Sequence, residues 1–401
     1  MNFTGATAGY QAGVQANDTR LAYAREATYG VAPKIAYQRL RLTGENFRRQ
    51  NNRQRPEEID PHWEASQAVT TQQTVGGTLS GALSFGSYDA LFACVCSGNT
   101  TDQMVYIPKD MPFTFERPAW NPGGITVATP HNYIWGDLPP AGFLRLWASA
   151  GKLNKVVPYR AALAPDYIVV PYDVFPTLPD NTTDGGTAAA SVITNDAIFN
   201  SITLIEQLGD DVLVRTGGFV KQIQLSISQG QFATFSADFD FRDEQRLTTS
   251  PATDLLAPTD SFVLDPVNGW GSIWIDGKKV DAPVRQFSAT LTRDGAGQDF
   301  ALGSVAAVGQ RPGSLTATGQ IQLFFRNSTE YQRFQDNWQG PVQVMLKDIK
   351  GNIYGLTFFS STLQNPQVNA TSKNSTIVAT FDIEGNPQPG GGTFSLSIFP
   401  A

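Results

Sequence analysis

Histidine is the first residue type to examine for catalytic or metal chemistry, because imidazole serves both. His62 and His131 lie 69 residues apart and belong to no His-x-x-x-His or His-Glu-x-x-His spacing, so the sequence favours no zinc site. The chain also lacks a Gly-x-Ser-x-Gly nucleophile elbow and a Gly-x-x-x-x-Gly-Lys-Ser/Thr phosphate loop. Gly295-Ala296-Gly297 lacks the third glycine of a dinucleotide motif and indicates a loop. These patterns predict no catalytic, metal or cofactor site.

Two cysteines, Cys94 and Cys96, are the other candidate ligands or nucleophiles. A strand would point residues two apart to opposite faces, so they cannot easily form a disulfide with each other. We therefore predict two buried thiols in a reducing compartment rather than a redox pair or metal ligands.

Carboxylates leave one enzymatic alternative open. A glycosidase needs only two carboxyl groups with suitable pKa values, and the chain holds 36 Asp and Glu residues and seven tryptophans. A carbohydrate-binding or carbohydrate-cleaving adhesin is thus one hypothesis. Most of the acids, however, lie in turns or on alternating strand faces, where solvated structural roles dominate.

A dense charge cluster follows residue 38. Arginines at 39 and 41 precede a run that we predict to be a contact loop between subunits: Arg48, Arg49, Arg53, Arg55, Glu57, Glu58 and Asp60. A basic run can indicate nucleic acid. Because acids follow at once, self-complementary contact between subunits is the favoured interpretation.

Composition sets the broad class. The chain has 401 residues, which predicts two or three domains. Its net charge of −7 argues against a dedicated nucleic-acid binder, which is usually basic. No signal peptide is expected from the first residues, and no apolar stretch approaches the length of a membrane span. Abundant glycine and proline favour many short strands and turns.

The elements that would carry these residues occur in two copies. Thr78–Phe85 and Thr316–Leu323 both alternate apolar and polar residues, as half-buried strands do, and both hold a glycine at the same step. A short helix with a possible serine cap is expected after each, at Ser87–Phe92 and Ser328–Phe334. A third block, Ala237–Phe241, matches Ala379–Ile383. The repeated order predicts two tandem β modules.

Spacing places an insertion in the first copy. Leu91 to Ala237 spans 146 residues and Phe334 to Ala379 spans 45, a difference of 101. The predicted order is an N-terminal arm (1–33), module 1 in two parts (34–96 and 196–245), a small β insertion domain (97–195), a connector (246–270) and module 2 (271–401). Arg48–Val75 and Gly295–Gly313 each join two predicted strands and are too long for tight hairpins.

Several segments in this order resemble the bacteriophage major tail tube protein family, of the siphophage type. The resemblance rests on Leu21–Gly30 with its Glu-x-Thr-x-Gly pattern, Gln38–Glu45, the pair Glu58-Ile59, Gly81–Asp89, Gly218–Ile227 and Phe232–Phe241. It covers most of both modules, and the insertion is its least familiar part.

The resemblance implies a fold and a function. Each module is expected to be a β-sandwich or split barrel with one short helix, and strands of neighbouring modules would join into a barrel around a lumen. Rings of six modules imply three chains per ring, stacked into the tube that delivers DNA into the host. In such a stack, we expect the long loops Arg48–Val75 and Gly295–Gly313 to reach the neighbouring ring. The implied partners are other copies of the chain and the tape measure, terminator and distal tail proteins. The implied location is the virion tail, assembled in the host cytoplasm, and no enzymatic activity is implied.

Reading the candidate strands face by face predicts a channel wall, because alternate residues point oppositely. The predicted lumen-facing residues are Thr78, Ser80, Ser84, Gln222, Gln224, Ser226, Asp238, Asp240, Thr316, Thr318, Gln320, Gln322 and Asp382. None is basic, which would let DNA pass without binding specifically. The alternative is that these residues form the solvent face of ordinary sheets. We expect the insertion to lie on the outside of the tube.

Overall fold

The computed structural model describes residues 15–57, 59, 65–106, 113–119, 121, 123–128, 138–148, 153–161, 167–179, 186–209, 211–369, 373–388 and 392–401. It is 57% strand and 6% helix, which confirms the mostly-β prediction. Within the described residues, no helix is long and apolar enough to cross a membrane.

The first half of the chain, without the insertion, supplies two sheets and one helix. Its elements are β1 (Arg20–Arg25), β2 (Ala36–Arg39), β3 (Gly44–Glu45), β4 (Arg48–Gln54), β5 (Val69–Ala82), α1 (Asp89–Cys96), β13 (Ile202–Leu208), β14 (Asp211–Ser228), β15 (Thr234–Phe241), β16 (Asp243–Leu247) and β17 (Asp254–Leu256), after a short 3-10 turn at Ala16–Asp18. The segment expected to be an N-terminal arm contributes β1, which pairs with β13 and buries Leu21.

The second half repeats this order. Its elements are β18 (Trp270–Ile275), β19 (Lys278–Lys279), β20 (Val284–Asp294), β21 (Gly297–Asp299), β22 (Gly309–Arg311), β23 (Ser314–Phe324), α2 (Thr329–Gln335), β24 (Gly340–Lys347), β25 (Ile353–Asn369), β26 (Val378–Asn386) and β27 (Phe394–Phe399). In both halves a long hairpin precedes the short helix, and a three-strand meander follows it. Neither helix has a side-chain cap, so the expected serine caps are absent.

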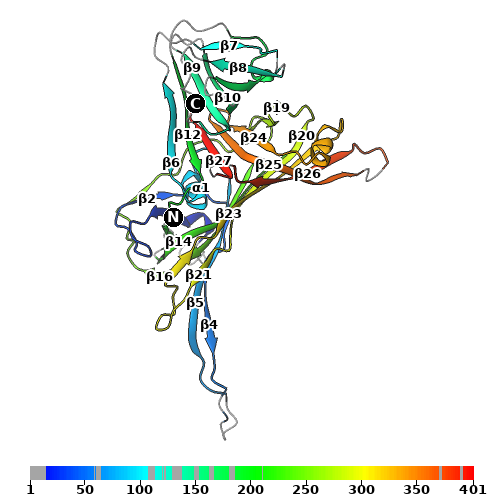
Figure 1. Cartoon of the computed structure of the whole chain (residues 1–401). Helices are drawn as coiled ribbons and strands as arrows, with labels where there is room; N and C mark the ends of the chain where they lie inside the picture. Colours follow the sequence, from blue (N-terminus) through cyan, green and yellow to red (C-terminus); the bar gives the residue numbers. More distant parts are fainter. Residues whose placement is uncertain are drawn as a thin grey trace, which may run out of the picture.

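One continuous antiparallel sheet joins the two halves (Figure 1). Its order is β25, β26, β23, β20, β14, β15 and β5, followed by β3 and β4 in line with each other. Each half therefore supplies four strand positions, and the seam between the halves is the β14–β20 pairing. We call this the eight-stranded sheet.

The β14–β15 and β25–β26 hairpins match in detail. Each long strand has an irregularity in its register, between Val220 and Gln222 in β14 and between Gln364 and Gln367 in β25. The residue after it lies opposite Asp238 in the first half and Thr380 in the second, and these two residues are aligned in the repeat.

The alignment of the glycine-containing strands was wrong, however. Ala237 lies opposite Leu79, whereas Ala379 lies opposite Leu323, six residues beyond the aligned Ala317. The glycines also serve different neighbours. A Cβ at Gly81 would lie 1.9 Å from the Tyr88 hydroxyl, so the glycine leaves room for the residue that precedes α1. Gly319 instead faces the Ser288 carbonyl and Phe358. Similar alternation alone does not fix register.

The insertion forms strands β6 (Thr100–Tyr106), β7 (Thr114–Glu116), β8 (Gly124–Ala128), β9 (Ala141–Ala148), β10 (Leu153–Ala161), β11 (Tyr167–Pro171) and β12 (Gly186–Thr194), with a 3-10 turn at Tyr172–Val174. Its core also takes in Trp274 and Phe399 of the second half. Ser191–Thr194 of β12 pairs with β27. The insertion interrupts the first half in the sequence, but in space its strand β12 extends a sheet of the second half (Figure 1).

The two halves share a single main core. The Arg293 guanidinium of β20 donates to the Val95 carbonyl at 2.6 Å and to the Ser97 hydroxyl, at the end of α1. The Tyr354 hydroxyl of β25 donates to Asp89 at the start of α1 and accepts from the Gly86 amide. Hydrogen bonds from buried or partly buried donors therefore fix the second half against the helix of the first.

Candidate functional site

The eight-stranded sheet has one buried and one polar face. On the buried face lie apolar side chains such as Leu79, Ile223, Phe235, Ile321 and Phe381, each at most 1% exposed. On the opposite face, one row of directly paired residues crosses seven strands: Ser80, Ser236, Gln224, Thr290, Thr318, Glu384 and Thr362. We call this side the polar face.

Most residues predicted to face a lumen meet on this polar face. The Thr78 hydroxyl donates to Asp238 at 2.6 Å, and the Gln320 amide donates to Asp382 at 2.9 Å. The other members on the face are Ser80, Gln222, Gln224, Ser226, Asp240, Thr316, Thr318 and Gln322. Residues more than 200 positions apart in the sequence are thus brought to one surface.

Ser84 is the exception. It is fully buried, where its hydroxyl pairs with the Ser87 hydroxyl at 2.6 Å. Strand β5 ends at Ala82, so the alternation that would place Ser84 on the polar face stops before it.

The polar face is hollowed and carries charges of both signs. Its central hollow, of 730 Å³, is lined by residues including Gln224, Thr318 and Glu384. A second hollow of 580 Å³ includes Arg48 and Lys221 beside the acids of β15, and Lys221 pairs with Asp240 at 3.0 Å. Arg285 lines a third. Residues outside the predicted set thus make the face mixed in charge rather than free of basic groups.

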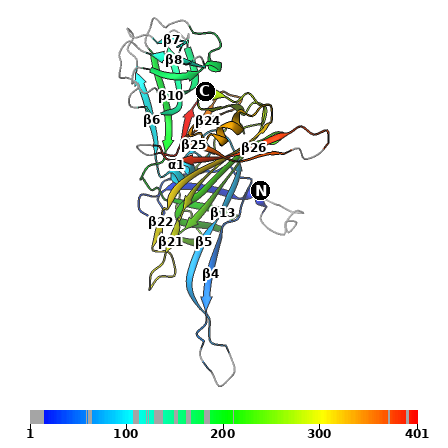
Figure 2. The ribbon, with the colours of Figure 1, turned by 45° about the vertical axis from the view of Figure 1, so that its right-hand side comes forward.

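The expected contact loop Arg48–Val75 is mostly a strand hairpin. β4 and β5 extend away from the body, and residues 55–68 connect them (Figure 2). Arg48, Arg49 and Arg53 lie in β4, and every residue of β4 is exposed. Arg55 and Glu57 follow the strand, while Glu58 and Asp60 lie outside the described residues. β4 escaped prediction because both of its faces are exposed, so no alternation marks it.

The second long loop behaves differently. It contains the small β21–β22 hairpin and packs on the first half of its own chain. The Gln73 amide donates to the Val305 carbonyl at 2.8 Å, and the Gln298 side chain donates to the Phe241 carbonyl at 2.7 Å. Leu302 at its tip is fully exposed.

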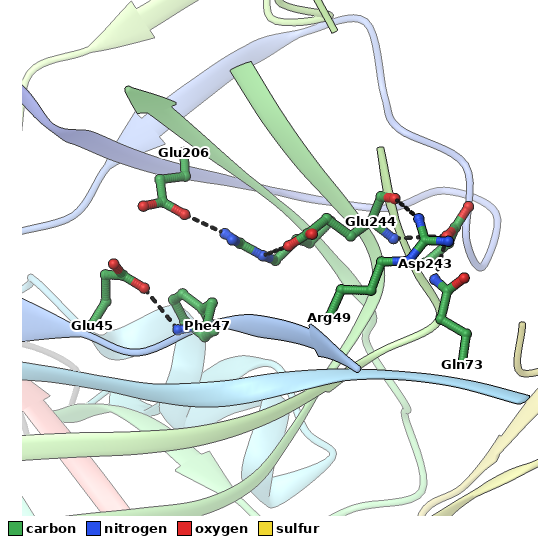
Figure 3. A network of polar contacts seen from close by, with 8 residues as sticks. Glu45, Phe47, Arg49, Gln73, Glu206, Asp243 and Glu244 are labelled. Atoms are coloured by element: carbon green, nitrogen blue, oxygen red, sulfur yellow. Dashed lines mark hydrogen bonds and ion pairs between the residues drawn. The ribbon is translucent and has the colours of Figure 1, made fainter. Parts of the chain in front are cut away.

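A buried charge network lies at the base of the β4–β5 hairpin. Arg215, 1% exposed, donates to Glu206 and to Glu244, each at 2.7 Å, and its guanidinium lies 5.0 Å from the centre of the Phe47 ring. Figure 3 shows Glu206 and Glu244 above the segment that carries Phe47. Phe47 precedes β4 directly, so the arginine holds the first residues of the hairpin against the sheet of β13, β14 and β16.

Further polar contacts extend this network along the hairpin (Figure 3). Arg49 donates to the Glu244 carbonyl at 3.1 Å, and the Gln73 side chain donates to Asp243 at 2.9 Å. Burial raises the pKa of the Glu206 carboxyl, and Arg215 opposes that rise. No sequence pattern predicted this network. Its only sequence signal is a charged residue directly after the apolar run Val212–Val214.

Metal binding is the remaining kind of site to consider. The described part of the chain holds no cluster of three or more His, Cys, Asp or Glu residues able to bind a metal. His62 and His131 both lie outside it.

The cysteines are two buried free thiols, as predicted. Burial raises the pKa of Cys94 and of Cys96 to about 12. Because the thiolate is the reactive form, we expect neither thiol to react with Ellman's reagent at pH 8 in the native protein, and both to react in denaturant. Rapid native labelling of either thiol would contradict this burial.

The family model for phage tail tube proteins matches residues 16–385, which is most of the chain and both of its halves. The chain belongs to the phage tail tube protein family. A search of the curated proteins finds no match.

Family membership makes this tail tube protein a structural component of the virion tail, able to associate with copies of itself and with other tail proteins. It also agrees with the mostly-β architecture. In the tail tube protein, the polar face and the exposed hairpin are therefore the surfaces that need a functional explanation.

Proposed function

We propose that three copies of this tail tube protein close into a ring with pseudo-sixfold symmetry, and that stacked rings form a channel for DNA. The observation that carries the proposal is the seam within one chain. Two halves of similar topology already join edge to edge through β14 and β20, in one sheet with one polar face.

Closure follows from repeating that seam. A head-to-tail interface generates a ring if its rotation closes. With four strand positions from each half, three chains would supply 24 strands to one barrel, and no strand edge would stay open to aggregation.

The polar face suits the inner wall. Acids on it accept hydrogen bonds from neighbouring side chains, and Lys221 is paired with Asp240, so part of the charge on this face is neutralised within the chain. Each phosphate that a wall neutralises adds salt-dependent affinity, and a wall of this kind lets DNA slide. The ring would act without catalysis, assemble in the host cytoplasm and meet the tape measure, terminator and distal tail proteins.

The insertion belongs on the outside in this arrangement. The insertion extends a sheet that contains β27 and the first part of β25. The later part of β25 pairs instead with β26 and contributes to the polar face, so the insertion and the polar face lie along different parts of this strand. Trp147 of β9, 42% exposed, should face the exterior. Trp135, the other tryptophan that would report on this, lies outside the described residues.

Electron microscopy of the purified, polymerised protein tests the proposal. We expect hollow tubes whose rings contain three chains, with Gln224 and Thr318 on the inner wall. Rings of six chains that each give one half to the barrel would reject the stoichiometry. Discrete globular particles with affinity for sugars would reject the function and favour the carbohydrate-binding alternative.

A charge change on the polar face tests the channel separately. In tails carrying Ser80→Lys with Gln322→Lys, tubes should assemble but DNA ejection should slow. The delay should shrink as the salt concentration rises, because salt weakens contacts between lysine and phosphate. For each such contact, the logarithm of the binding constant falls by about 0.9 for every tenfold increase in salt concentration.

The matched control is Ser80→Glu with Gln322→Glu, which has similar bulk and opposite charge. It should eject DNA at the normal rate. If the lysine variant ejects normally from assembled tails, these two side chains do not face the DNA.

A further inference from the structure

Two strand edges of the eight-stranded sheet lack a partner in the described chain. The first is the later part of β25, residues 362–369. It pairs with β26 on one side, and its pairing with β24 and β27 ends by Ser361. The second is β3 with β4, which pairs only with β5. An open edge presents a row of unpaired backbone donors and acceptors, ready to pair with another chain.

These two edges correspond to the two strands of the internal seam. β25 matches β14, as their shared register irregularity shows. β3 and β4 match β20, because both precede the central hairpin strand, and Phe47 beside Gly77 takes the place of Phe287 opposite Ile321. The seam therefore shows how the free edges would pair if a second copy supplied the missing half.

From this correspondence we infer that β25 of one subunit pairs antiparallel with β4 of the next, in the register of the β14–β20 seam. This inference rests on the proposed ring and adds its residue-level joint. In the seam, Gln222 lies opposite Thr292. Gln367 takes the place of Gln222, because each follows the irregularity. Leu79 of β5 and Leu323 of β23 correspond, because they lie opposite the aligned Ala237 and Ala379. Seven residues before each, Gln72 lies opposite Asn52 and Thr316 lies opposite Thr292, so Asn52 takes the place of Thr292.

The joint thus sets Gln367 opposite Asn52, Val368 opposite Asn51 and Asn369 opposite Gln50. The pairs of Gln367 with Asn52 and of Asn369 with Gln50 continue the polar face, as Gln222 and Thr292 do within the chain. Charge is complementary too. The β4 edge carries exposed arginines, and Asp382 and Glu384 lie on β26, the strand next to the β25 edge. Arg53 would then approach Gln364, beside Asp382.

The chemistry of the free β4 edge fits a second copy of this chain rather than an unrelated partner. Its residues are Arg, Gln and Asn throughout, which keeps an unpaired strand soluble before assembly. Affinity would then come from backbone hydrogen bonds and specificity from register, as in other strand additions.

Paired cysteines test the register in tubes of the full chain. The variant Asn52→Cys with Gln367→Cys should form disulfides between subunits when tubes are oxidised, because directly opposite residues lie within disulfide range. A denaturing gel should show a ladder that ends at three chains. The control Gln50→Cys with Gln367→Cys is two residues out of register, about 7–8 Å apart, and should cross-link at least ten-fold less. Each single cysteine variant should stay monomeric on the gel, because Cys94 and Cys96 are buried.

The outcomes separate the joint from the ring. Tubes with equal cross-linking of both pairs, or with none, overturn the joint and leave the proposed function standing. If the cysteine variants fail to form tubes, a reconstruction of wild-type tubes decides by whether β25 lies beside a neighbour's β4 in this register. Wild-type protein that forms no tubes under any polymerising condition overturns the function and the joint together.

Discussion

Replacing Arg215 with alanine is expected to lower the free energy of unfolding by about 3–5 kcal/mol, because it leaves two carboxylates at a buried site without their cation. Glu206 is 3% exposed and shares this guanidinium with Glu244. The Phe47 ring also loses its cationic neighbour, so the root of the β4–β5 hairpin should become a site of protease cleavage. Urea unfolding and limited proteolysis measure the two effects.

Arg246 provides the matched control. It lies on β16, and its bidentate pair with Asp211 is solvent-exposed. Arg246→Ala should cost less than about 1 kcal/mol, as exposed pairs do. An equal loss in both variants would show that burial of the Arg215 network is not what makes it costly.

A triple replacement separates charge from packing. Arg215→Met with Glu206→Leu and Glu244→Leu removes all three charges and keeps most of the volume. Such exchanges often restore stability, so it should unfold at or above the wild-type urea concentration. If this variant is stable but its hairpin is still cleaved, the network serves to orient the hairpin as well as to stabilise the fold.

Removing the hairpin tip is expected to abolish tube formation while leaving a folded, soluble protein. Residues 55–68 would be replaced by Asn-Gly, which closes a tight turn after the last pair, Gln54 with Val69. The strands β4 and β5 that carry the tip extend away from the body, so its loss should not lower the melting temperature measurably (Figure 2). Electron microscopy should show single rings or subunits in place of tubes.

A variant that keeps the whole hairpin separates the effect of the tip's charge from the effect of its length. Arg55→Gln keeps the hairpin and removes an exposed cation of the tip. If cross-ring ion pairs matter, its tubes should dissociate at lower salt than wild-type tubes. Normal tubes from the shortened protein would show that the hairpin does not hold rings together.

Sequence patterns predicted the strands in which one face is buried. β5, β14, β15, β23 and β26 all alternate, and their polar residues fall on one side as expected. β4 gave no such signal, because both of its faces are exposed. Alternation also failed to fix which residues of β23 and β26 lie opposite one another.

Side-chain partners far apart in the sequence were beyond prediction. The Arg215 network depends on the pairing of β14 with β16, and Arg215 lies directly opposite Glu244 only because of that register. The same holds for the insertion, whose strand β12 pairs with β27 some 200 residues later. The sequence alone does not show which distant strands pair, so it does not show which side chains become neighbours.

The β14–β20 seam has a consequence for the kinetics of assembly. In a three-chain ring, three of the six joints form during folding, as unimolecular steps that do not depend on protein concentration. Because the two halves belong to one chain, each of those joints costs only the entropy of closing a loop. That cost is smaller than the translational entropy lost when two separate molecules associate. In the proposed ring, the geometry of these joints would likewise be set inside each subunit before it meets another. The first encounter between subunits would therefore extend a sheet that already contains one joint, and the folding of a single chain would largely decide ring size.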